Sequence, residues 1–148
     1  MQKVGLHEHC QSVIQQKLDE IEAAIRQAQR AANEETESSA GEKYETGRAM
    51  MHLEKEKLAS QQAATLKLKK VLDQINPRRP TDQIALGSLV DTSQGTFYIA
   101  VSLGSVLFEE RRYLVISPVA PIGQALQGLR AGDDFVFNGN TVKINHVY

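Results

Sequence analysis

The sequence predicts an α+β protein, with an N-terminal antiparallel helical hairpin followed by a small, mostly antiparallel sheet domain that carries one short helix. Three observations predict this fold. Apolar residues recur at helical spacing in the first half of the 148-residue chain, a proline-containing segment NPRRPTD ends that pattern, and short β-branched and aromatic runs fill the second half. We therefore predict a coiled-coil hairpin over residues 1–76, a linker over 77–80 and a sheet domain over 81–148.

The first predicted helix has a heptad-like apolar seam with spacings of three and four residues. Between the seam positions lie mostly Gln, Lys, Glu and Arg, so the apolar stripe is narrow and the helix, of about 25 residues, needs a partner. The seam also gives the single cysteine a structural role, as a small core residue. The seam residues are Cys10, Ile14, Leu18, Ile21, Ile25, Ala28 and Ala32.

The second predicted helix begins near Glu42 and continues to about Ile75. Tyr44, Met51, Leu58 and Leu72 keep a seven-residue register, and Pro77 and Pro80 end the helix. An antiparallel coiled coil buries both stripes. Heptad seams also pair between chains, so the sequence leaves the oligomeric state open.

Between the helices lies an acid-rich segment over residues 33–48, NEETESSAGEKYETGR. Small residues at positions 38–41 favour a tight reversal, which places carboxylates at the tip of the hairpin. We expect this tip to be delivered into a site of another macromolecule; alternatively, the acids only stabilise solvated helix ends. The tip carboxylates are Glu34, Glu35, Glu37, Glu42 and Glu45.

The second half reads as strands over residues 84–90, 95–102, 105–108 and 112–117, then a short helix from Pro121 to about Gly128. Two alternating runs flank Asn138-Gly139, a strong hairpin signal. Arg111 and Arg112 follow two glutamates in what reads as a hairpin turn.

Composition narrows the classes of function. The net charge is −1, which gives no global attraction to nucleic acid or to an anionic membrane. One cysteine excludes an intramolecular disulfide, and no apolar run is long enough to span a membrane. We expect a soluble cytoplasmic protein without a membrane partner and without a cofactor of its own.

The segment Ala120–Asp133, APIGQALQGLRAGD, resembles the SPIxxALLGxxxGD signature of the Gre-type transcription elongation factors, with Ala120 in place of the serine. The stretch around Tyr44 and Arg48 resembles the family's DLxENAEYxxAR. The likeness covers nearly the whole chain and implies a coiled coil joined to an FKBP-like domain, with Tyr44 and Arg48 supporting the tip. The motif residues of the polymerase-binding domain would be Pro121, Ile122, Gly123, Leu126, Gly128, Gly132 and Asp133.

The resemblance implies a factor that binds RNA polymerase, inserts its tip into the secondary channel and stimulates cleavage of backtracked transcripts. It would not be an enzyme itself and would meet DNA and RNA only within the elongation complex. Glu37 and Glu42 would share the polymerase's Mg²⁺, a hard cation that prefers carboxylate oxygens. Aligned on Tyr44 and Arg48, Glu37 occupies the family's aspartate position and Ala40 its glutamate position.

Because of Ala40, a channel-binding regulator without cleavage activity stays open as an alternative. A second alternative is a generic coiled-coil adaptor, which would be insensitive to tip charge. An FKBP-like domain also suggests a third alternative, a prolyl isomerase. Such an enzyme needs an open pocket lined by aromatic residues. Aromatics make up only 5% of the chain, and a small core needs most of them.

Overall fold

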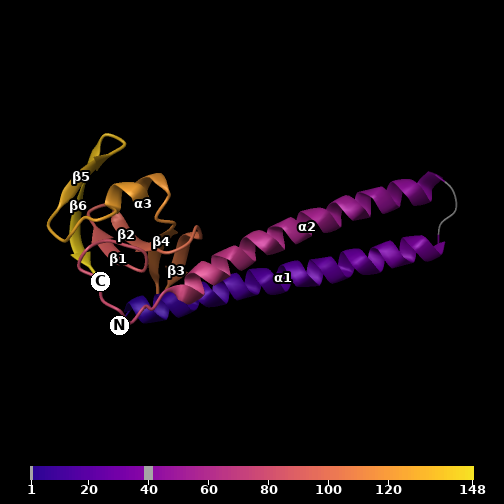
Figure 1. The fold of residues 1–148 in the computed structure, drawn as a ribbon, viewed down its shortest axis with the longest axis horizontal. Helices are drawn as coiled ribbons and strands as arrows, with labels where there is room; N and C mark the ends of the chain where they lie inside the picture. The colour runs from indigo at the N-terminus through magenta and orange to yellow at the C-terminus, as the bar shows by residue number, and fades with distance from the viewer. Residues whose placement is uncertain (1, 39–41) are drawn as a thin grey trace. The chain divides into compact units, whose positions relative to one another are not determined.

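The computed structural model describes residues 2–38 and 42–148, and the side chains of residues 2–34 and 47–148. Two long helices, α1 (Gln2–Ser38) and α2 (Glu42–Gln74), precede a six-stranded sheet and a short helix α3 (Pro121–Leu126), which confirms the α+β prediction (Figure 1). The strands are β1 (Leu89–Thr92), β2 (Gly95–Ile99), β3 (Gly104–Phe108), β4 (Arg111–Ile116), β5 (Asp134–Phe137) and β6 (Asn140–Val147).

The chain divides into two compact units. The first, which we call the sheet unit, comprises Met1–Ser12 and Lys70–Tyr148, and the second, the helical unit, comprises Val13–Lys69. Both long helices run without interruption from one unit into the other. The first turns of α1 and the last turn of α2 are therefore built into the sheet unit, while the division of the chain at residues 76 and 81 stays a prediction.

In the helical unit the two helices bury a narrow stripe. Ile14 and Leu18 of α1 are buried, as are Leu58 and Thr65 of α2, which keep the seven-residue spacing. Thr65 is a polar member of this stripe, and its hydroxyl donates to the carbonyl of Gln61 over 2.8 Å. Thr65 can therefore occupy a buried position of the stripe, because its hydroxyl already has a hydrogen-bond partner.

The direction of the pairing follows from contacts between the helices. In the helical unit the ammonium of Lys55 donates to the side-chain oxygen of Gln29. In the sheet unit Gln11 donates to Asp73 over 3.1 Å. Residues early in α1 thus meet residues late in α2, as an antiparallel hairpin requires.

The sheet has the order β3-β4-β2-β1-β6-β5. Every neighbouring pair is antiparallel except β2 and β4, which run parallel. Asn138 and Gly139 join β5 to β6 with φ angles of 51° and 80°, so the predicted hairpin is confirmed. Glu109 and Glu110 form the turn between β3 and β4 with φ angles of 50° and 64°, an uncommon backbone conformation for residues other than glycine.

One face of the sheet holds an apolar core to which α3 contributes Leu126. Ile122 and Phe135 pack against the edge of this core. The core residues are Ile84, Val90, Phe97, Ile99, Leu126 and Ile144.

A second group of buried and half-buried side chains ties the first turns of α1 to the strands. His7 meets Tyr98 of β2 edge to face, with ring centroids 6.0 Å apart, and His9 meets Phe108 of β3 at 5.3 Å. Leu6 and Cys10 are fully buried, so the prediction of Cys10 as a core residue is confirmed.

Several predicted boundaries were wrong. The strand expected over residues 95–102 ends at Ile99. The strand expected from residue 84 begins only at Leu89, because Gly87 has a φ of 94° and the segment before it forms a single bridge between Gln83 and Arg130. Helix α1 starts at Gln2 and has 37 residues, longer than expected, because its first turns bury Lys3, Leu6 and His7. A seam that begins at Cys10 cannot reveal those tertiary contacts.

Gly123 leads to the first testable prediction. A Cβ at this position would lie 2.4 Å from the carbonyl oxygen of Ser117, a backbone atom that cannot rotate away. We expect Gly123→Ala to lower the free energy of unfolding by about 1–3 kcal/mol, as overpacking does. Urea denaturation followed by circular dichroism measures this change.

Gly5→Ala is the matched control. Its Cβ would lie 2.9 Å from the end of the Phe108 ring, which can turn aside, and alanine favours the helix by about 1 kcal/mol. Gly5→Ala should therefore change stability much less than Gly123→Ala does. Equal effects of the two substitutions would contradict the steric account.

Candidate functional site

The predicted tip carboxylates come from the facing ends of α1 and α2. Glu34, Glu35 and Glu37 belong to the last turns of α1, and Glu42 and Glu45 to the first turns of α2. The side chain of Glu34 is exposed; those of the other four, and of Tyr44, lie outside the described residues, as does the backbone of 39–41. Arg48 is exposed on α2.

The predicted Mg²⁺ ligands, Glu37 and Glu42, are among the side chains outside the described set. Within the described set, no group of three or more His, Cys, Asp or Glu side chains is arranged to hold a metal ion. None of the helices, over the residues searched, combines the length and apolar character needed to cross a membrane.

Most of the segment Ala120–Asp133, which we call the signature segment, maintains the fold of the sheet unit. Leu126 is fully buried in the core, and Gly123 allows α3 to approach the preceding loop. Gly128 and Gly132 have φ angles of 80° and 94°, and their amides donate to Ile84 and Ile144, each over 2.9 Å. Asp133 accepts a hydrogen bond from the amide of Arg130 over 2.8 Å, which closes the turn before β5.

A partner can reach the beginning of the segment at Pro121 and its end at Gly132 and Asp133, which are all exposed. Pro121 is exposed at the first position of α3, where its fixed φ suits a helix start. Val119, two residues earlier, is 74% exposed, and Leu114 on β4 is 38% exposed. These apolar side chains are exposed on the surface of the sheet unit.

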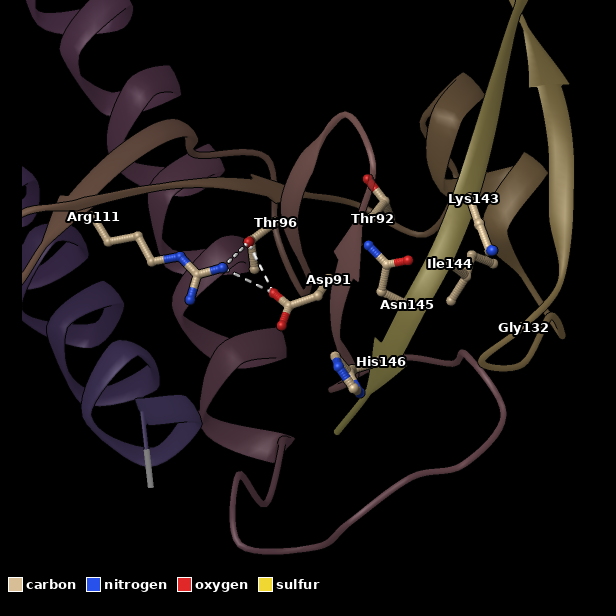
Figure 2. A pocket seen from close by; sticks show the side chains of 9 residues that line it. All are labelled: Asp91, Thr92, Thr96, Arg111, Gly132, Lys143, Ile144, Asn145 and His146. Atoms are coloured by element: carbon tan, nitrogen blue, oxygen red, sulfur yellow. Dashed lines mark hydrogen bonds and ion pairs between the residues drawn. The ribbon is translucent and has the colours of Figure 1, made fainter.

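A polar groove lies elsewhere on the sheet unit, across strands β4, β2, β1 and β6. It encloses about 550 Å³, is open to solvent and is shown in Figure 2. The groove is lined by Asp91, Thr92, Thr96, Arg111, Gly132, Lys143, Ile144, Asn145 and His146.

One end of the groove is a fixed hydrogen-bond network centred on Asp91. Its Oδ1 accepts from Arg111 over 3.0 Å and from the hydroxyl of Thr96 over 2.9 Å. Arg111 also donates to the Thr96 hydroxyl over 2.6 Å and lies 5.4 Å from the centre of the Tyr113 ring. The network compensates the charge of Arg111 with that of Asp91 and holds both side chains in place.

The other end of the groove is shaped by an irregularity in β6. Asp91 pairs with His146 but Thr92 pairs with Ile144, so Asn145 is an extra residue in the ladder. Such a bulge bends a strand and redirects its side chains. Figure 2 shows the Asn145 amide between Asp91 and the side chain of Lys143.

The amino-acid sequence gives little indication of this groove. Its only local signals are polar residues within strand runs, namely Asp91 after two buried apolar residues, and Lys143 and Asn145 alternating with Val142 and Ile144. Alternation of this kind also marks an ordinary solvated sheet face. The bulge and the neighbouring strands that create the groove depend on the tertiary fold.

Lys3 is the most unusual buried side chain in the sheet unit, with only 1% of its surface exposed. Its ammonium donates to the carbonyl of Arg79 over 3.0 Å and to that of Tyr148 over 2.9 Å. Burial lowers the pKa of this ammonium below its usual value. Through Lys3 the start of α1 is tied both to the segment after α2 and to the end of β6.

His7, Tyr98 and Cys10 form a second buried polar group. Nδ1 of His7 lies 2.7 Å from the Tyr98 hydroxyl. Burial lowers the pKa of His7 and raises that of Tyr98, so a phenol that donates to a neutral imidazole is the favoured pair. Burial also raises the pKa of the Cys10 thiol to about 11, which makes it a poor nucleophile.

Neither the comparison with protein-family models nor the search of curated proteins found a match for this chain.

The lowered pKa of His7 predicts how stability depends on pH. The imidazole of His7 binds a proton more readily in the unfolded state than in the folded state. The stability that the neutral imidazole contributes is therefore fully present above pH 6.5, and it is lost as the pH falls from there toward the folded-state pKa of His7. We expect the free energy of unfolding to decrease from pH 7.5 to pH 5, with a shallower slope in His7→Asn. Urea denaturation at several pH values measures both slopes.

His52→Asn is the control, because the His52 side chain is 74% exposed and its contact with Glu56 is an exposed pair of the kind that contributes little to stability. It should change the pH dependence much less than His7→Asn does. A slope in His7→Asn equal to that of the wild type would show that His7 does not carry the effect.

Proposed function

We propose that this protein is a Gre-like transcription factor that binds RNA polymerase and inserts the acidic tip of its helical hairpin into the secondary channel. The observation that carries the proposal is the hairpin itself, in which two long helices join across three residues within an acid-rich segment. From Val13 to Ser38, α1 rises about 39 Å at 1.5 Å per residue. This length suits delivery of a few side chains into a narrow channel.

The narrow seam of the hairpin supports the same function. Among the described residues of the helical unit, few side chains are buried, for example Leu18 and Leu58, and most of the exposed positions are polar. The exposed apolar side chains include Met50, Leu53 and Leu66 of α2. A thin, mostly polar pair of helices can enter a water-filled channel while burying little apolar surface there. The tip would add carboxylate oxygens beside the polymerase's own Mg²⁺, where they would hold the ion and orient water.

The sheet unit would supply the binding energy. Pro121, Val119 and Leu114 are exposed and belong to, or lie near, the segment that resembles the family signature. Exposed apolar side chains of this kind favour a protein partner. The buried members of the signature, Gly123 and Leu126, would act indirectly by holding α3 in place.

A second candidate function is a regulator that enters the channel without promoting cleavage. The observation that favours it is Ala40, which stands at the position of the family's second tip carboxylate. A single acid, Glu37, would bind the shared Mg²⁺ more weakly than two. For cleavage, Glu42 would have to serve as the second carboxylate ligand of the Mg²⁺.

Transcript cleavage in stalled, backtracked elongation complexes tests the proposal. We expect the wild type to accelerate cleavage, and Glu37→Ala or Glu42→Ala to reduce the rate by tenfold or more while polymerase binding is retained. The reason is that each substitution removes a metal ligand and leaves the sheet unit unchanged. Binding is measured in parallel by co-sedimentation with the polymerase.

Glu54→Ala is the matched control, because Glu54 is an exposed acid on the same helix, farther from the tip. It should leave cleavage unchanged. Binding without cleavage in the wild type would favour the channel-binding regulator. Absence of polymerase binding would contradict both functions and leave the coiled-coil adaptor.

A further inference from the structure

The polar groove of the sheet unit has features of a ligand site that the proposed function does not use. It shares only Gly132 with the signature segment and contains none of the tip residues. Its volume of about 550 Å³ lies within the range of small-molecule sites. The groove could therefore bind a ligand whether or not the protein has the proposed function.

The groove presents polar groups without protein partners. Throughout the described part of the chain, the side chains of Lys143 and Asn145 make no hydrogen bond, and Asp91 uses only Oδ1. Lys143, Asn145 and His146 are exposed, so a ligand can reach them. By contrast, the charge of Arg111 is already compensated by Asp91.

Lys143 and the Asp91–Arg111 pair lie at different ends of the groove. Lys143 belongs to β6 and Arg111 to β4, with β1 and β2 between them, which corresponds to about 14 Å at the usual strand spacing. In the described part of the chain the Lys143 ammonium forms no ion pair, although Asp134 of β5 lies opposite Lys143 in the ladder. The Asp91 end offers a fixed carboxylate oxygen, Oδ2, that can only accept hydrogen bonds.

We propose that the groove binds a small phosphorylated molecule, with the phosphoryl group at Lys143 and Asn145 and a hydroxyl- or amine-bearing body extending toward Asp91. The ammonium and the amide are separate donors that can approach different oxygens of a tetrahedral phosphoryl group. A donor-bearing body complements Oδ2 of Asp91. The ordered Arg111–Thr96 network holds that acceptor in position before the ligand arrives.

Sugar phosphates and nucleotides share this chemistry. A nucleic-acid strand fits less well, because Arg111 in the groove is paired with Asp91, Lys143 lies opposite Asp134, and the chain has a net charge of −1. The bulge at Asn145 also confines the site to one part of the sheet. The ligand class is thus a single phosphate ester with a polar body.

The test is a ¹H–¹⁵N NMR titration of the full chain with inorganic phosphate, ribose 5-phosphate, adenosine 5′-monophosphate, adenosine and a short single-stranded RNA. We expect saturable shifts at residues 91–92 and 143–146 for at least one of the two phosphate esters, with a Kd of about 1 mM or lower. Adenosine should bind at least tenfold more weakly than its monophosphate. A response to ribose 5-phosphate alone would identify the ligand as a sugar phosphate.

Lys143→Ala should weaken binding of the ester about tenfold or more, because it removes a charge-assisted hydrogen bond. Arg112→Ala is the matched control. It removes an exposed cation from β4 whose side chain bonds Ser105 and does not line the groove, and it should leave the affinity unchanged. The amide spectrum of each variant reports whether it is folded.

Absence of saturable shifts with both phosphate esters would overturn the proposal. Shifts that persist in folded Lys143→Ala, or that weaken equally in Arg112→Ala, would also overturn it, since they would indicate non-specific attraction of anions. Preferential binding of the RNA over both esters would assign the groove to nucleic acid instead.

Discussion

Much of the sheet unit depends on the burial of the first turns of α1 against its strands. Lys3 and His7 are polar side chains in this interface, and each has partners that only the folded chain supplies: two backbone carbonyls for Lys3 and the Tyr98 hydroxyl for His7. An unpaired buried polar group is costly, so these contacts define one arrangement of helix and strands. Because α1 continues unbroken into the helical unit, the same helix that closes the sheet core also forms one arm of the hairpin.

The two regions with functional potential in the sheet unit differ in how they are built. The signature segment is mainly architectural, since Gly123, Gly128 and Gly132 allow close approaches and turns while Leu126 fills the core. Its exposed residues include Pro121 at the start of α3 and Gly132 and Asp133 before β5. The polar groove arises instead from the bulge in β6 and the Asp91–Arg111 pair, which bring together residues from four strands. A resemblance in sequence therefore points to the first region and gives no indication of the second.

The sequence predicted the fold class and most helices and strands, because periodicity and turn chemistry are local. The seam at Cys10, Ile14 and Leu18 is buried, and Asn138-Gly139 forms the expected turn. What sequence reasoning missed depends on tertiary contacts: the burial of Lys3, the late start of β1 after Gly87, and the parallel pairing of β2 with β4. Of the candidate site, the sequence located the acid-rich segment and the signature but could not reveal the groove.

The proposed function requires the hairpin to deliver its tip to the catalytic centre of RNA polymerase. The most direct measurement attaches an iron chelate at Ala40→Cys and maps hydroxyl-radical cleavage in a stalled elongation complex. Cys10 is buried and the pKa of its thiol is raised to about 11, so it should not be labelled. The account predicts cleavage of the transcript near its 3′ end and of polymerase segments around the catalytic Mg²⁺. Cleavage confined to the outer surface of the polymerase, or none at all, would contradict it.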